Sequence, residues 1–334
     1  AGSFGQLGNG DTRDSNVPVT VAGEVHFSSL TAGSAHTCGI STDREAWCWG
    51  SNASGALGIG TTSRDLAEPA LVAGGHRFTM LDAGVGFTCG VTVDQRLYCW
   101  GSNGHGELGD GTREPHSIPE EVSGDGRYRM VSAGLVHVCA LSAHQDVFCW
   151  GLNDFGQLGD STLTPALVPI PIAGGHTFSQ VRAGHFFSCG LTDAGEAWCW
   201  GSNISFEMGN GSNDIEPVVA PEPVATSNRF TRITSGAFHS CALRTDRSLM
   251  CWGANTNGKL GNGTFVATVL PTVVAGPFRF IDVSSGGNFT CGLAADDGAY
   301  CWGSNQLGQL GNGKDDDTNE PTGVFGHSRE HPGI

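Results

Sequence analysis

Hydrophobic and polar residues alternate along the chain in short runs that are separated by turn-forming residues. Within Arg77–Val122 such runs lie near residues 77–82, 86–92, 97–100 and 118–122. Alternation with a period of two is typical of β-strands with one buried face, because successive side chains point to opposite sides. The pattern therefore predicts four short strands, of which the second and third form a hairpin over VDQR at 93–96.

The same unit recurs along the whole chain. The phrase CGISTDREAWCWGSN at Cys38–Asn52 returns in five further variants, always with its two cysteines ten residues apart. A recurrence of about 50 residues is typical of propeller blades, so the sequence predicts six copies of one four-stranded unit. The paired positions, which use all twelve cysteines of the chain, are Cys38 with Cys48, Cys89 with Cys99, Cys139 with Cys149, Cys189 with Cys199, Cys241 with Cys251, and Cys291 with Cys301.

These repeats predict an all-β fold, a β-propeller of four-stranded blades that forms a single domain over residues 1–334. Six blades are preferred and seven are the alternative. Two residues before the first cysteine of each unit, histidine and phenylalanine alternate strictly, which closes without a mismatch only in an even-membered ring. The alternating residues are His36, Phe87, His137, Phe187, His239 and Phe289. We expect the histidines to make hydrogen bonds in the core or in turns, and a shared metal is disfavoured because they lie two blades apart.

The two ends of the chain depart from the repeat. Residues 1–23 form a partial repeat that contains the strand-like VPVTV at 17–21, and we expect it to supply a closing or spare strand. Residues 326–334 are expected to form a C-terminal tail.

The cysteine pairs have three interpretations. A zinc site needs four ligands, usually grouped two or three residues apart, and no unit offers a fixed third and fourth ligand. A disulfide needs only a Cα separation of about 5.5 Å, which paired antiparallel strands supply. We therefore predict one hairpin disulfide per blade, and regard a metal site or a redox pair as disfavoured. Six disulfides persist only in an oxidising compartment, so we expect a secreted, periplasmic or cell-surface protein.

The phrases AGSAHTCGI and AGLVHVCAL, with Trp-Gly-x-Asn and Gly-Gln-Leu-Gly, resemble the regulator of chromosome condensation repeat family. The resemblance covers nearly the whole chain, and the hairpin cysteines make it look like a secreted, bacterial-type variant. It implies a β-propeller, usually of seven blades, that serves as a rigid platform for other proteins. In that family nucleotide exchange on the GTPase Ran relies on acidic residues in the turn between the first and second strands. No Asp or Glu occupies this turn in any of the six units, so the resemblance does not imply nucleotide-exchange activity for this chain.

Composition and motifs argue against several function classes. The formal charge of −16 and the pI near 5.0 oppose binding to a phosphate backbone, so we expect no nucleic-acid partner. No apolar run is long enough to span a membrane. KDDDTNE at 314–320 alternates acidic residues like a calcium loop, but Glu320 stands where a glycine must turn the chain. We find no catalytic grouping and predict no enzyme activity, no metal and no cofactor; a propeller hydrolase is a disfavoured alternative.

Function is expected where the copies differ, because variable loops on a rigid frame carry recognition. The turn before the second strand carries apolar and aromatic residues in four consecutive units, which predict either a partner-binding face around the axis or a plug of the axial channel. The candidate face consists of Val85, Leu135, Val136, His185, Phe186 and Phe238. We therefore predict a secreted, non-catalytic scaffold that binds a protein or another extracellular macromolecule. The alternative is a structural subunit of an extracellular assembly or filament, with self-assembly through the spare strand.

Overall fold

The computed structural model describes residues 1–62 and 64–327, which form six four-stranded antiparallel sheets and no helix. Within each sheet the strands pair in chain order, so each sequence repeat forms one blade. Blades 1 to 3 contain β1–β4 (Phe27–Ala32, His36–Ser41, Ala46–Gly50, Leu66–Leu71), β5–β8 (Phe78–Ala83, Phe87–Thr92, Leu97–Gly101, His116–Glu121) and β9–β12 (Tyr128–Ala133, His137–Ser142, Val147–Gly151, Ala166–Pro171). Blades 4 to 6 contain β13–β16 (Gln180–Ala183, Phe187–Leu191, Ala197–Gly201, Val218–Pro223), β17–β20 (Phe230–Ser235, His239–Arg244, Leu249–Gly253, Thr268–Val273) and β21–β24 (Phe280–Ser285, Phe289–Ala294, Ala299–Gly303, Thr318–Gly323).

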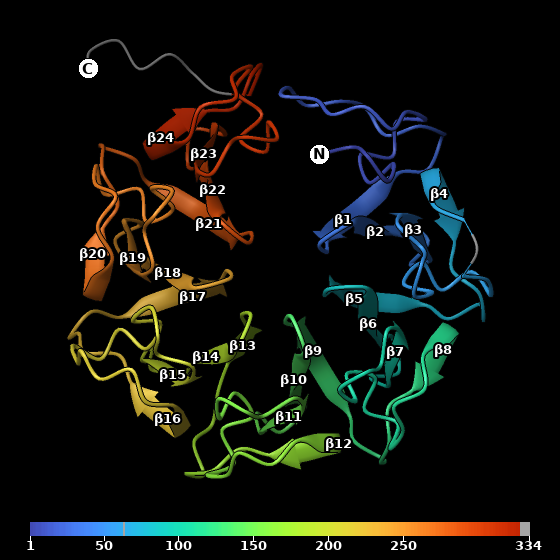
Figure 1. Ribbon diagram of the computed structural model, residues 1–334, viewed down its shortest axis with the longest axis horizontal. Coiled ribbons are helices and arrows are strands. Elements are labelled where there is room, and N and C mark those ends of the chain that lie inside the picture. The colour runs from blue at the N-terminus through green and yellow to red at the C-terminus, as the bar shows by residue number, and fades with distance from the viewer. Residues whose placement is uncertain (63, 328–334) are drawn as a thin grey trace.

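The blades are arranged around a central axis, with the first strand of each blade nearest the axis and the fourth at the rim (Figure 1). The fold is a six-bladed β-propeller, as the repeat count predicts. In blade 2 the four strands begin and end within two residues of the ranges expected from the alternation of hydrophobic and polar residues.

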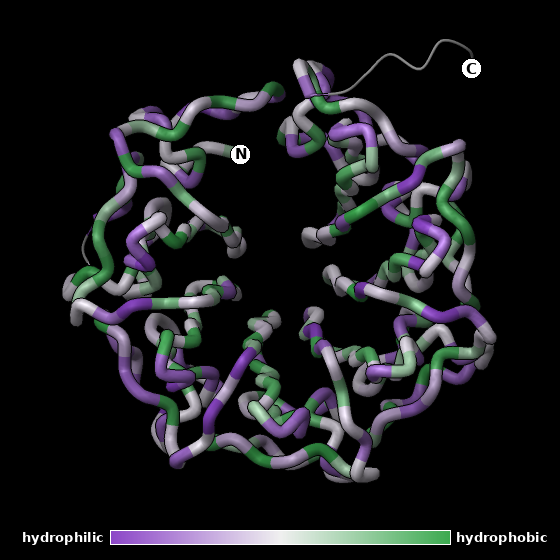
Figure 2. The backbone as a smooth tube through the Cα atoms, turned by 180° about the vertical axis from the view of Figure 1, so that it is seen from behind, coloured by the Kyte–Doolittle hydropathy of each residue, from purple (hydrophilic) through white to green (hydrophobic). Residues whose placement is uncertain are grey.

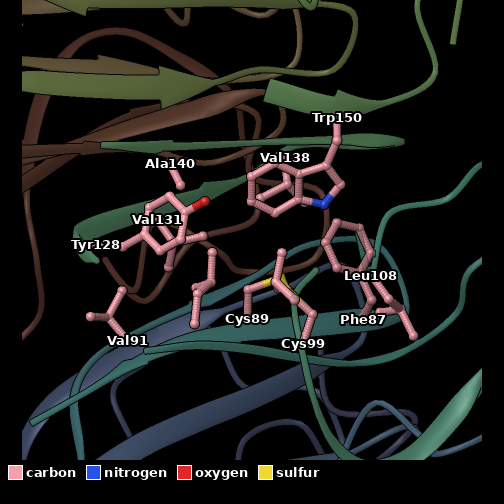
Figure 3. Packing of buried hydrophobic residues seen from close by; sticks show 12 residues of the cluster. Phe87, Cys89, Val91, Cys99, Leu108, Tyr128, Val131, Val138, Ala140 and Trp150 are labelled. Atoms are coloured by element: carbon pink, nitrogen blue, oxygen red, sulfur yellow. A yellow bond between two sulfur atoms is a disulfide. The ribbon is translucent and has the colours of Figure 1, made fainter. Parts of the chain in front are cut away.

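The hydrophobic residues are distributed through every blade and do not form one central cluster (Figure 2). They pack between neighbouring blades, as Figure 3 shows for blades 2 and 3. There Phe87 and Leu108 of blade 2 share a cluster with Val131 and Trp150 of blade 3, and each of the four is at most 1 % exposed. Because burial of apolar surface is the main stabilising term, each blade depends on its neighbours for stability.

In blades 1 to 5 the loop after the third strand packs the glycine that follows its buried Leu or Met against the tryptophan of the next blade. Leu57 is fully buried, and Gly58 has a φ of +66°. A Cβ atom on Gly58 would lie 2.7 Å from Trp100 Nε1, so only glycine fits there. Trp100 Nε1 donates a hydrogen bond to the carbonyl of Ala56 at 2.9 Å. These tryptophans therefore pack blade against blade.

All six predicted disulfides are present, one in the central hairpin of each blade, so the cysteine pairing read from the repeat is confirmed. The bonded pairs are Cys38 with Cys48, Cys89 with Cys99, Cys139 with Cys149, Cys189 with Cys199, Cys241 with Cys251, and Cys291 with Cys301. No free cysteine is found among the described residues. The alternative interpretations of these cysteines as metal ligands or as a redox pair are therefore not needed.

The disulfides differ from the prediction in one respect, the distance between the backbones. Cys38 and Cys48 face each other across β2 and β3 with their Cα atoms 4.1 Å apart, which is shorter than the separation of about 5.5 Å expected for a disulfide. Ser41 N donates to Glu45 O, and Ser51 N donates to Ala35 O. Since hydrogen-bonded pairs alternate along the hairpin, the cysteines occupy a non-hydrogen-bonded pair, where Cα atoms approach most closely.

Residues 1–22 lie between blade 6 and blade 1 and contribute no strand to the described sheets (Figure 1). The segment at 17–21 therefore belongs to no strand. The expectation that residues 1–23 supply a closing or spare strand stays a prediction. Of the tail expected at 326–334, only Gly326 and His327 belong to the described residues.

Candidate partner-binding face

The turns between the first and second strands of the blades lie together at one end of the propeller axis. In blade 1, Ser51 N, directly after β3, donates to Ala35 O in this turn at 2.8 Å. In blade 4, Ser202 N donates to Phe186 O at 2.9 Å. These bonds place the beginning of the loop that follows the third strand at the same end as the turn. We call the surface formed by these turns and loop beginnings the mouth face.

Aromatic rings from three blades meet on the mouth face. The ring centroids of His185 in blade 4 and Phe238 in blade 5 are 5.3 Å apart in an edge-on arrangement. The ring of Phe186 lies 5.1 Å from that of Phe155, which comes from the loop after β11 of blade 3. Edge-on and tilted ring pairs at these distances are favourable arrangements for aromatic side chains. We call His185, Phe186, Phe238 and Phe155 the aromatic cluster.

The structure brings together three of the six residues predicted for this face, namely His185, Phe186 and Phe238. The other three are aliphatic residues in the corresponding turns of blades 2 and 3 and do not belong to the aromatic cluster. They are Val85, Leu135 and Val136. Val85 is 39 % exposed, and the other five predicted residues are partly buried. Their role in binding stays a prediction. Sequence reasoning did not single out Phe155, although it stands where blade 1 has Ser54.

A buried lysine lies beside the aromatic cluster. Lys259 is only 2 % exposed, and its Nζ donates to Asn288 Oδ1 at 2.6 Å. Burial lowers the pKa of His185, and the positive charge of Lys259 lowers it further. The imidazole of His185 is therefore neutral near pH 7, which makes the cluster easier to desolvate. Lys259 is not among the residues predicted for this face, because its contact with Asn288 joins two blades and no local sequence pattern indicates it.

A buried carboxyl group occupies the position equivalent to Lys259 in blade 4. Glu207 Oε2 accepts a hydrogen bond from Ser205 N at 2.8 Å, while Glu207 Oε1 has no hydrogen-bond partner. Burial raises the pKa of Glu207 to about 7. In blade 3 the same position holds the neutral Gln157, whose Oε1 accepts from Phe155 N. Ionisation of Glu207 therefore lowers the stability of the folded protein.

The three histidines that alternate with phenylalanine join adjacent blades. His36 Nε2 lies 2.8 Å from Thr88 Oγ1, and Thr88 Oγ1 donates to Ala56 O at 3.0 Å. Thr88 therefore accepts from the imidazole, which fixes the proton of His36 on Nε2. His137 and His239 repeat this contact with Ser188 and Thr290, both at 2.8 Å. The prediction that these histidines make core hydrogen bonds is confirmed.

The described residues contain no group of three or more His, Cys, Asp or Glu side chains that could hold a metal ion. The cysteines are all engaged in disulfides, which indicate an oxidising compartment.

The sequence profile of the RCC1-like domain matches residues 1–331 of the chain. The chain belongs to the RCC1-like domain family. This result agrees with the resemblance noted from the repeated motifs and with the propeller fold.

Comparison with known proteins gives both sequence and structural relatives. The ultraviolet-B receptor UVR8 of Arabidopsis thaliana is 34 % identical over 122 residues, which cover 36 % of this chain and 28 % of the receptor. Human WBSCR16 superposes with a TM-score of 0.84 at 18 % identity, over 93 % of this chain and 84 % of that structure, which supports the fold alone. Prp20p of Saccharomyces cerevisiae superposes with a TM-score of 0.79 at 25 % identity, over 89 % of this chain and 76 % of that structure. Prp20p has binding properties to Gsp1p and histones.

The chain spans little more than a quarter of the length of UVR8, and the E3 ubiquitin-protein ligase HERC2 of Homo sapiens matches it over only 3 % of the ligase. No helix in the described ranges is long and apolar enough to cross a membrane.

Proposed function

We propose that this chain is a secreted, periplasmic or cell-surface scaffold that binds another protein through its mouth face and has no chemistry of its own. The aromatic cluster is the observation that carries this proposal. Rings from three blades converge on a rigid frame and remain partly exposed. Aromatic residues held in this way are enriched among binding hot spots, since they bury a large area at a small cost in conformational entropy.

Two further observations support the proposal. The six hairpin disulfides indicate an oxidising compartment, which favours secretion, the periplasm or the cell surface. Prp20p, a structural relative, binds Gsp1p and histones, so protein binding is known for this propeller architecture.

The test is a double variant that combines Phe186→Ser with Phe238→Ser. We expect the free energy of unfolding to fall only modestly, because both side chains are partly exposed, and capture of a natural partner from the extracellular fraction of the source to be lost. Val93→Ser is the matched control, because Val93 is 51 % exposed in the β6–β7 hairpin turn at the opposite end of the blade. A loss of several kcal/mol would instead support a plug of buried side chains. Undiminished capture by a stable variant would reject the site.

A structural role in an extracellular assembly is the second candidate function. It is favoured by the apolar side chains exposed on blades 1 and 6, where Leu30 is 58 % and Leu293 is 40 % exposed. The mass of the purified chain in size-exclusion chromatography separates the candidates. A single monomeric species supports the binding scaffold, while a ladder of oligomers supports the assembly.

A further inference from the structure

One buried cation of the mouth face has no counter-charge. Lys259, in the loop after β19 of blade 5, is 2 % exposed, and its Nζ donates to Asn288 Oδ1 of blade 6 at 2.6 Å. An ammonium group has three N–H donors, but among the described residues this amide oxygen is its single acceptor and no ion pair is formed. Burial lowers the pKa of Lys259 below its ordinary value. Burial of an ammonium group without a counter-charge is unfavourable, because its lost hydration is not replaced.

The other blades carry a different type of side chain at this position. Where the counterpart ends in an amide or carboxyl group, one of its oxygens accepts a hydrogen bond from the backbone N–H two residues earlier in the same loop. These counterparts are Gln6, Glu107, Gln157, Glu207 and Gln309. A lysine side chain has no acceptor and cannot make this contact. Lys259 therefore does not stabilise its own loop in the way that these residues do.

The backbone holds the amine at the border between blades 5 and 6. The carbonyl of Lys259 accepts hydrogen bonds from Thr290 Oγ1 at 3.1 Å and from Trp302 Nε1 at 3.0 Å. Ser304 N donates to Asn288 O at 2.8 Å, which places Asn288 in the turn on the mouth face. Asn288 is exposed, whereas Lys259 is buried. The ammonium group is therefore in direct contact with an exposed residue of the mouth face.

The turn that carries Asn288 adjoins the aromatic cluster. Ala237 N in blade 5 donates to Gly287 O in blade 6 at 3.1 Å, and Phe238 follows Ala237 directly. The rings of Phe238 and His185 are 5.3 Å apart. Gly287 is exposed, and a Cβ atom on it would have no neighbour within 4 Å. The mouth face thus has partly exposed rings on blades 4 and 5 and, beside them, open space at the turn that contacts the ammonium group.

We propose that the Lys259–Asn288 pair is a recognition site for a carboxylate, which an Asp or Glu side chain of the partner protein supplies. The side chain of Asn288 turns outward, and a carboxylate oxygen takes the place of its Oδ1 as the acceptor for Lys259 Nζ. A charged acceptor forms a stronger hydrogen bond with an ammonium group than a neutral amide does. An apolar residue next to the acid covers Phe238 and His185. This site deepens the proposed function and rests on it, because the carboxylate belongs to the protein that binds the mouth face.

Peptides of defined charge test the site, with the lysine signals of the full chain as the readout. The chain contains two lysines, Lys259 and the exposed Lys314, so ¹³C-labelled lysine gives two sets of side-chain NMR signals. N-acetyl-Leu-Glu-amide should shift the Lys259 signal saturably and leave that of Lys314 unchanged. N-acetyl-Leu-Gln-amide has a similar shape without the charge and should bind about tenfold more weakly. The pKa of Lys259 should rise when the acidic peptide is bound.

Two variants assign the preference to the proposed atoms. Lys259→Gln removes the ammonium group and introduces the residue that stands at Gln6, Gln157 and Gln309, so the variant is expected to fold and to bind both peptides equally. Asn288→Asp supplies a carboxylate from the chain itself, so it should raise the pKa of Lys259 and remove the preference for the acidic peptide. Equal affinity of the parent for both peptides, or a preference that Lys259→Gln retains, overturns the proposal. Tighter binding of N-acetyl-Leu-Leu with a free carboxyl end than of N-acetyl-Leu-Glu-amide overturns the side-chain source and assigns the carboxylate to a chain end.

Capture of the natural partner separates this inference from the proposed function. Lys259→Gln should weaken capture, and the combination of Phe186→Ser with Phe238→Ser should abolish it. If the double variant loses capture while Lys259→Gln retains it in full, the mouth face binds its partner without the carboxylate, and this inference alone fails. If neither variant changes capture, the proposed function fails, whereas a preference of the parent for the acidic peptide still supports the carboxylate site.

Discussion

At the scale of single residues, the alternation of histidine and phenylalanine has a local cause. His36, His137 and His239 each contact a Thr or Ser hydroxyl of the next blade, and burial lowers their pKa to about 4, 3 and 3. The number of six blades inferred with the help of this alternation is confirmed. The argument that the alternation closes without a mismatch only in an even-membered ring does not apply, however. Blades 6 and 1 do not meet near the axis.

Replacing these three histidines with phenylalanine should make the propeller less sensitive to acid. In the unfolded chain a histidine takes up a proton near pH 6.5, whereas the folded protein holds it neutral down to about pH 4. As the pH drops from about 6.5 to about 4, the free energy of unfolding of the parent should therefore decrease by about 1.4 kcal/mol per pH unit for each histidine. Urea unfolding at pH 7 and pH 4.5 measures the difference. Equal acid-induced losses in variant and parent would contradict the assignment; Phe87 shows that phenylalanine fits this position.

Glu207→Gln should stabilise the protein at pH 8. Burial raises the folded pKa of Glu207 to about 7 from an ordinary value of 4.5, so stability is lost as pH rises through this window. The variant should gain roughly 1–3 kcal/mol at pH 8. The gain should shrink towards pH 4.5, where the carboxyl group is protonated in the folded state and half protonated in the unfolded state. Thermal unfolding at the two pH values tests this, and a gain of equal size at both would point to packing instead of charge.

At the scale of strands and loops, alternation and turn residues were sufficient to place the four strands of blade 2 and the cross-strand cysteines. Both predictions depend only on residues that lie close together in the sequence. The contact of Phe155 with Phe186 and that of Lys259 with Asn288 join different blades, so no local pattern reports them. Residues 17–21 look like a strand, but no neighbouring strand is available to pair with them.

One hairpin disulfide should make a measurable but limited contribution to stability. Cys139→Ala together with Cys149→Ala removes the disulfide of blade 3. The hairpin of this blade is also stabilised by the pairing of β10 with β11 and by the burial of its side chains. We expect the free energy of unfolding to fall by about 2 kcal/mol, less than the loop-entropy limit, because the loop of ten residues is short. Denaturant unfolding measures this. Intact mass after alkylation without reductant should show no free thiol in the parent, and a bridge between blades would contradict the pairing.

At the scale of the whole molecule, residues 1–22 connect blade 6 with blade 1. They supply the Gln6 carbonyl to blade 1 and the Asn16 carbonyl to blade 6. Their deletion should lower the Tm by roughly 5 °C or more, because the donors on Thr37 and Trp49 lose their acceptor. Removal of Ala1–Phe4 alone leaves Gln6 in place and should have little effect. Equal effects of the two deletions would contradict this role.

The central claim is that the aromatic cluster is a protein-binding surface on a rigid propeller. Site-specific photo-crosslinking tests it most directly, with p-benzoylphenylalanine in place of Phe186 and, as a control, of Val93 at the opposite end of the blades. The account predicts that the probe at position 186 crosslinks one defined protein from the native extracellular medium, and that the probe at position 93 does not. The absence of a crosslinked protein at position 186, or the same product from both positions, would contradict it.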